Sequence, residues 1–308
     1  MIGAEKNTGS SHARSLRKDK RAVSPAISTV ILTAAVIVMI LVAMGFANTF
    51  LDARMAENEF STNKQFMLTT GLQIDDIAWT IGRTQTVRYS SKYGNIKFQS
   101  SALNYSVEVN GTGTGGVWQS LFPNGTETGM ILFNIPVSTY SISNNYFERI
   151  SPASNGSFLQ QGPSAPVSHV FCIEKLPMSE GNYTRIVVVP SIRMLNSTIG
   201  GSQQGTTNYF KFYLPTLVPA GSNPYRSQSI TLNGDSITKV IKSGVSQVRI
   251  NVTFPNGKPL STQGFDYDFF NFDHTIGSLN MASEIVSLPA GSVVEFYVGK
   301  VKVTLGQV

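Results

Sequence analysis

The residues best suited to hold a metal ion lie in a short segment near the C-terminus, residues 265–274, where aspartates alternate with aromatic residues. If this segment is a strand, Asp266 and Asp268 share one face, and Asp273 can join them from a turn. Carboxylate oxygens are the ligands that Ca²⁺ prefers, so these three aspartates are the candidates for a calcium site. The segment lacks the glycine and the distal glutamate of an EF-hand loop, and a strand edge over an aromatic core explains it better. We therefore predict no metal site.

The same segment ends with an Asp–His pair that could begin a catalytic dyad, Asp273 and His274. No nucleophile motif accompanies the pair, and the sequence has no metalloprotease, phosphate-loop, nucleophile-elbow or dinucleotide-binding motif. The single cysteine, Cys172, excludes an internal disulfide and a cysteine-based zinc site, and its apolar neighbours are typical of a buried thiol. The sequence therefore predicts no enzymatic activity and no cofactor.

Several asparagines could carry glycans, because each begins an Asn-x-Ser/Thr triplet. Composition alone predicts about four such triplets, so seven is a mild excess. All of them follow residue 100, and three coincide with Asn-Gly turn signals. The candidates are Asn104, Asn110, Asn124, Asn155, Asn182, Asn196 and Asn251.

The positive charge of the chain is concentrated at its N-terminus. The formal net charge is +6, from 24 Lys and Arg against 18 Asp and Glu, yet the first 21 residues alone contribute +4. Only 14% of the residues are charged, against roughly 25% in an average soluble domain. A nearly neutral body does not attract phosphate backbones, so we predict no nucleic-acid partner.

A long uncharged segment follows the basic N-terminus. Residues 22–51 contain no charged side chain, and as a helix they reach about 45 Å, more than the hydrocarbon core of a bilayer. The basic residues at 17–21 predict that the N-terminus lies in the cytoplasm and that the chain after Asp52 lies outside. This apolar core is too long for a standard secretory signal. Ser24 and Pro25 suit the first turn of its helix.

The segment Lys20-Arg21-Ala22-Val23-Ser24-Pro25, followed at once by the apolar helix, resembles the class III signal of archaeal type IV pilins and archaellins. The resemblance covers about residues 14–60. It implies that a prepilin peptidase recognises Lys20, Arg21, Ala22 and Val23 and cuts between Ala22 and Val23. One departure is Ile27, at the fifth mature position, where bacterial type IV pilins usually have glutamate. An ordinary uncleaved membrane anchor would need only the basic flank and the apolar span.

The remaining pattern predicts an α+β architecture, in which a long helix is followed by an antiparallel, sandwich-like β head. After the basic leader at 1–22, the helix covers 23–82, with its apolar part at 23–51 and an amphipathic part at 52–82. The amphipathic part has an apolar stripe that recurs at helical spacing. The stripe consists of Met67, Gly71, Ile74, Ala78 and Ile81.

Charged residues at 52–64 are expected to lie in water or at contacts between subunits. Residues 83–308 alternate short strand patterns with turn signals, one of which is Asn233-Gly234-Asp235. A boundary between two sub-sandwiches would fall at 221–227.

By this resemblance the chain is expected to be a subunit of a cell-surface filament, a pilus-like polymer of identical copies joined through their N-terminal helices. The implied partners are a prepilin peptidase, a membrane platform protein and an assembly ATPase, together with the membrane itself before assembly. Two alternatives stay open. One is an archaellin-like subunit of a swimming filament, and the other is an uncleaved, singly anchored surface protein whose head binds a ligand.

Overall fold

The computed structural model describes residues 20–142, 146–152, 159–174, 182–201, 205–221, 227–253 and 282–306. The chain divides into two compact units, Met1–Arg54 and Met55–Val308. The α+β layout is as predicted, with one long N-terminal helix followed by a large β region.

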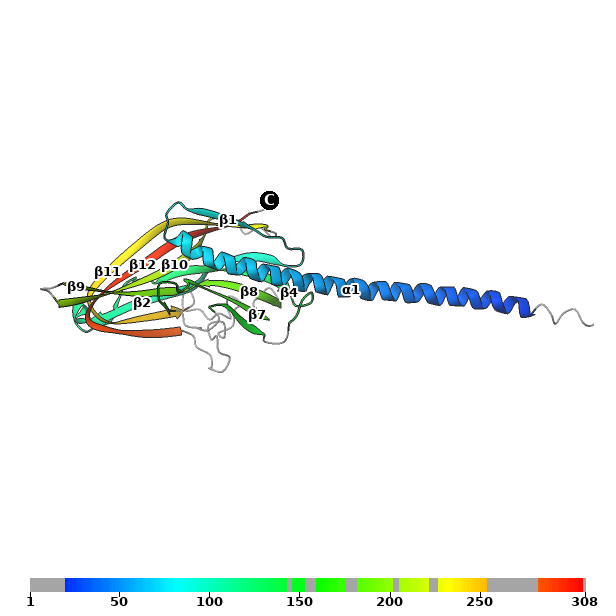
Figure 1. Cartoon of the computed structure of the whole chain (residues 1–308), viewed down its shortest axis with the longest axis horizontal. Helices are drawn as coiled ribbons and strands as arrows, with labels where there is room; N and C mark the ends of the chain where they lie inside the picture. Colours follow the sequence, from blue (N-terminus) through cyan, green and yellow to red (C-terminus); the bar gives the residue numbers. More distant parts are fainter. Residues whose placement is uncertain are drawn as a thin grey trace, which may run out of the picture. The chain divides into compact units, whose positions relative to one another are not determined.

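Helix α1 runs from Lys20 to Ala78. The part that belongs to the second unit buries one face against the sheet (Figure 1, cyan). Within the predicted stripe, Met67, Gly71, Ile74 and Ala78 are buried. Ile81 is exposed, because the helix ends three residues before it.

The β region contains twelve strands and a 3₁₀ turn in its described part. They are β1 (Thr84–Arg88), β2 (Asn95–Gly111), η1 (Thr112–Thr114), β3 (Gln119–Ser120), β4 (Thr126–Pro136), β5 (Phe147–Ser151), β6 (Leu159–Gln161), β7 (Ser168–Glu174), β8 (Tyr183–Pro190), β9 (Ile192–Gly201), β10 (Gly205–Pro219), β11 (Ser229–Thr253) and β12 (Ala282–Gly306).

The expectation of a sandwich is wrong, because these strands form one sheet rather than two. Its order is β5-β7-β8-β4-β2-β11-β12-β10-β9-β6, with β1 paired to β11 and β3 paired to β2. Most pairs are antiparallel, but β10 pairs with β12 in parallel, and so does β6 with β9. The pair of β10 and β12 is parallel because of the path of the chain. From β10 the chain goes to β11, which lies two places away in the sheet, and β12 then returns to fill the place between them.

Strands β11 and β12 are continuous at points where the sequence predicts breaks, and this continuity holds the sheet together. The turn signal Asn233-Gly234-Asp235 is a β-bulge inside β11, and the chain passes through it without reversing. Further bulges lie between Lys242 and Gln247, and β12 passes Gly291 with φ of 81°. Strands β11 and β12 curve along their length in Figure 1. Bulges let one sheet bend without a chain break. Residues 222–226 of the predicted boundary lie outside the described residues.

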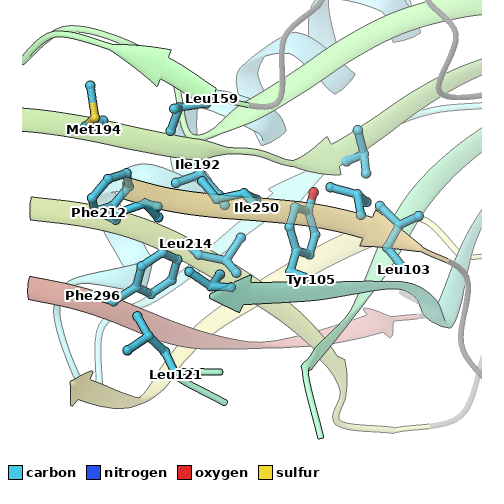
Figure 2. Close-up of a cluster of buried hydrophobic side chains, with 14 of the residues drawn as sticks. Leu103, Tyr105, Leu121, Leu159, Ile192, Met194, Phe212, Leu214, Ile250 and Phe296 are labelled. Atoms are coloured by element: carbon cyan, nitrogen blue, oxygen red, sulfur yellow. The ribbon is translucent and has the colours of Figure 1, made fainter. Parts of the chain in front are cut away.

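Both faces of the central strands are buried. In β4, Met130 and Leu132 belong to one apolar cluster and Ile131 and Phe133 to the other, as the alternation of a strand requires. The second cluster includes the helix residues and lies under α1. The first lies between strands of the curved sheet, since β10 contacts β4, β2 and β8 across it. Figure 2 shows side chains of this first cluster, which come from strands far apart in the sequence.

Candidate functional site

The candidate functional site is the apolar part of α1, residues 27–51. Its large apolar side chains are exposed, with exposed fractions from 40% at Val36 to 74% at Phe46. Residues 36–42 are seven consecutive apolar positions, which is about two helical turns, and all are exposed. The exposed apolar surface therefore extends around the whole circumference of the helix. An amphipathic helix of a soluble domain would have a polar face instead.

Two of the polar side chains in this segment bond within the helix. The Thr33 hydroxyl donates to the Thr29 carbonyl at 2.8 Å, and the Thr49 hydroxyl donates to the Gly45 carbonyl at 3.0 Å. Such bonds satisfy hydroxyl groups where no water is available. Beyond Leu51 the first cation, Arg54, lies over the Phe50 ring at 5.3 Å from its centroid. Among the described residues, this is the one helix long and apolar enough to cross a membrane, which is weak support for a single-pass anchor.

The four residues of the predicted cleavage site lie in the first turns of α1. The backbone of Lys20, Arg21, Ala22 and Val23 is helical, and the helix begins at Lys20. The basic flank and the small residue therefore directly precede the exposed apolar surface. Their assignment to leader processing stays a prediction.

Polar contacts at three places along its length attach the rest of α1, which belongs to the second unit, to the sheet. Near the start of this part, the Glu59 carboxylate accepts hydrogen bonds from the backbone N–H groups of Lys92, Tyr93 and Gly94, at 2.8–3.1 Å. One turn on, the Lys64 ammonium pairs with Glu148 of β5 at 2.5 Å.

At its end, one oxygen of Asp75 accepts from the Trp79 indole N–H and the other from Arg193 of β9, each at 2.7 Å. These contacts tie the helix to a loop and two strands of the β head.

The sequence interpretation missed these contacts. It expected Glu59 and Lys64 to lie in water or at contacts between subunits, but both contact the β region of the same chain. The only local signal was the spacing of Asp75 and Trp79, four residues apart and therefore neighbours on a helix. The other partners are 33 to 118 positions away in the sequence, so no local pattern reveals them.

The glycosylation candidates fall into two groups in the described part of the chain. Asn124, Asn182 and Asn196 are exposed, and Asn124 lies in a turn closed by the bond from the Gly125 N–H to the Phe122 carbonyl. Asn104 and Asn110 on β2 and Asn251 on β11 are half-buried and lie within paired strands, and the exposed Asn196 also lies within a paired strand, β9. The side-chain oxygens of Asn104 and Asn251 are buried. Asn155 lies outside the described residues. The exposed group offers the better acceptors.

The other predicted site residues give no cluster. Cys172 is buried as expected, and burial raises the pKa of its thiol to about 12, so it stays protonated and inert. Asp266, Asp268, Asp273 and His274 lie outside the described residues. Within the described residues, no group of three or more His, Cys, Asp or Glu side chains could hold a metal ion.

Comparison of the whole chain with protein-family models, with curated proteins and with solved structures finds no match.

Proposed function

We propose that the chain is the precursor of a structural subunit of an archaeal type IV pilus-like filament on the cell surface. A prepilin peptidase removes residues 1–22, and the freed apolar helix packs with identical helices of other copies. The precursor is a single-pass membrane protein with its N-terminus in the cytoplasm, and its β head is extracellular and available for adhesion. In this role the chain catalyses no reaction.

The observation that carries the proposal is the fully apolar, exposed circumference of residues 27–51 directly after a basic leader and a small residue. Such a surface is stable in lipid or against copies of itself. Lipid is as apolar as leucine, so helices leave it for one another through close packing rather than through a hydrophobic gain. Small side chains permit that approach, and this segment contains several. They are Ala26, Ser28, Ala34, Ala35, Ala43, Gly45 and Ala47.

The second support is the firm attachment of the rest of α1 to the β head. Phe60, Met67 and Ile74 are buried, and Glu59, Lys64 and Asp75 bond to the head, so the same helix that is exposed at one end is fixed at the other. A filament subunit needs this combination, because a load on the head must reach the packed helices. The resemblance of residues 14–60 supplies the partners: the peptidase, a platform protein and an assembly ATPase.

Intact-protein mass spectrometry of native surface fractions tests the proposal. The expected mature chain begins at Val23. Arg21→Glu should leave uncleaved precursor in the membrane and abolish filaments in electron micrographs. Arg14→Glu is the matched control, because it removes the same charge from the leader seven residues before, and it should be processed normally. Comparison of the two variants therefore separates an effect on recognition of the cleavage site by the peptidase from an effect on the positive-inside signal.

Each alternative predicts a different result. An uncleaved surface protein keeps the Arg21-Ala22 junction and forms no polymer, and this outcome would refute the proposal. An archaellin-like subunit is cleaved and forms filaments, but deleting it stops swimming rather than attachment. Normal filaments from Arg21→Glu would contradict the cleavage mechanism directly.

A further inference from the structure

The β head contains a pocket of about 110 Å³ at the ends of β2, β4 and β8. For comparison, a cavity of about 150 Å³ accommodates benzene, so this pocket suits a molecule of about five heavy atoms. Its lining residues are Lys92, Tyr93, Gly94, Asn95, Asn134, Pro136 and Tyr183. All of them belong to the second unit, so the pocket does not depend on how the apolar helix packs.

Every polar side chain that lines the pocket can donate a hydrogen bond. Lys92 supplies an ammonium group, Asn95 an amide, and Tyr93 and Tyr183 supply phenol hydroxyls. The side-chain oxygen of Asn134 accepts one hydrogen bond from Arg185, and the N–H₂ group of Asn134 can donate to a ligand. No carboxylate is among the lining residues.

A fully buried cation lies behind this lining. Arg185 has no exposed surface, and its guanidinium donates to Asn134 at 2.5 Å and lies 4.8 Å from the centroid of the Tyr183 ring. Asn95, Asn134 and Arg185 are direct neighbours across β2, β4 and β8. The sheet register therefore places the guanidinium next to two of the lining side chains. In a buried environment its charge is little screened, so it favours an anion in the pocket.

The wall formed by residues 92–94 is held in place by a carboxylate that does not line the pocket. Glu59 of α1 accepts hydrogen bonds from the backbone N–H groups of Lys92, Tyr93 and Gly94. On the pocket side, the Lys92 ammonium donates to the Tyr93 hydroxyl at 2.8 Å and lies 4.6 Å from the centroid of that ring. This position of the loop is fixed without any ligand, so little ordering is needed on binding.

We infer that this pocket binds a small oxyanion, a carboxylate or a phosphate, through Lys92, Asn134 and Tyr183. The ligand must accept hydrogen bonds, because every polar side chain of the lining can donate one. A negative ligand is favoured by the cationic Lys92 in the lining and Arg185 behind it, because the Glu59 carboxylate is already bonded to three backbone N–H groups of residues 92–94. A neutral sugar fits less well, since it gains nothing from the charges of Lys92 and Arg185.

Titration calorimetry on the full chain in detergent tests this, with inorganic phosphate and acetate as separate probes and chloride at the same ionic strength as reference. Saturable binding of one probe is expected, and the stronger probe identifies the anion. Lys92→Met should weaken binding at least about tenfold, because it removes a charge-assisted hydrogen bond. The matched control is Lys300→Met, which removes the same charge from an exposed position of β12 outside the lining and should bind as the wild type does.

A second variant keeps the test independent of folding defects. Asn134→Asp is nearly isosteric, its carboxylate pairs with Arg185, and it places a negative charge in the pocket wall, so it should abolish anion binding while the far-ultraviolet circular dichroism stays unchanged. Two results would overturn the inference. One is the absence of saturable binding of either probe beyond that of chloride, and the other is an equal loss for Lys92→Met and Lys300→Met.

Discussion

The end of α1 rests on the backbone of two neighbouring strands, and a single methyl group should push it away. Gly299 of β12 and Gly234 of β11 lie under this end. An ideal Cβ at Gly299 would be 2.4 Å from the Ala78 carbonyl oxygen and 2.9 Å from the Trp79 ring. One at Gly234 would be 2.4 Å from the Thr80 carbonyl oxygen. At both glycines the nearest neighbour is a backbone atom, which cannot rotate aside as a side-chain tip can. Gly299→Ala therefore forces the helix end to move.

The size of the effect follows from this geometry. Ordinary contact with a Cβ begins near 3.4 Å, so the Ala78 carbonyl must retreat by about 1 Å. Overpacking of this kind costs about 1–3 kcal/mol, and we expect the upper end because the obstacle is backbone. The displacement also strains the bond from the Trp79 indole N–H to Asp75. For a folded unit of this size, about 3 kcal/mol lowers Tm by roughly 6–12 °C.

The measurement is denaturant unfolding of the full chain in detergent, followed by tryptophan fluorescence. The chain has two tryptophans, and Trp79 lies at the contact in question. Gly200→Ala is the matched control: Gly200 lies in β9, an added Cβ has nothing within 4 Å, and we expect no loss of stability. If Gly299→Ala unfolds at the same denaturant concentration as Gly200→Ala, the helix end does not rest against β12 and the reasoning is refuted.

Two further predictions concern the polar attachment and the apolar part of α1. Burial raises the pKa of Glu148, but hydrogen bonds from Lys64 and Tyr146 and the charge of Lys64 outweigh it and leave the pKa below its ordinary value. The ion pair therefore stabilises the fold above about pH 4.3 and is lost as pH falls through the folded-state pKa. Lys64→Met should cost up to about 1 kcal/mol at neutral pH and progressively less in acid, and a pH-independent difference in denaturation midpoint would contradict this. Gly45→Leu should leave membrane insertion and cleavage intact, because an added Cβ at Gly45 has nothing within 4 Å, but should reduce filament yield in electron micrographs. The neighbouring Met44→Leu, which conserves volume, should assemble normally, and equal yields from the two variants would show that close approach at Gly45 is not needed.

The sequence predicted what depends on local periodicity. The apolar run at 22–51 and the stripe through Met67 and Ile74 have helical spacing, and the helix follows them. The strands of the head were recognisable for the same reason. Their arrangement was not, because register and sheet order depend on pairs such as Asn95 with Asn134 and Asn134 with Arg185, which lie 39 and 51 positions apart. The turn signal at Asn233-Gly234-Asp235 misled because a glycine also suits a bulge under a helix end.

The same reasoning separates the roles of the two parts of α1. The charged residues at 52–64 were expected to lie in water or at contacts between subunits. Glu59 and Lys64 instead bond to the head of their own chain, as does Asp75 farther along, so their charges are already compensated and would gain little from a neighbouring copy. Residues 27–51 have the opposite character, since their apolar side chains are exposed all round. In the proposed filament, cohesion between copies would therefore come mainly from shape and small side chains in the apolar part, and it should depend only weakly on salt.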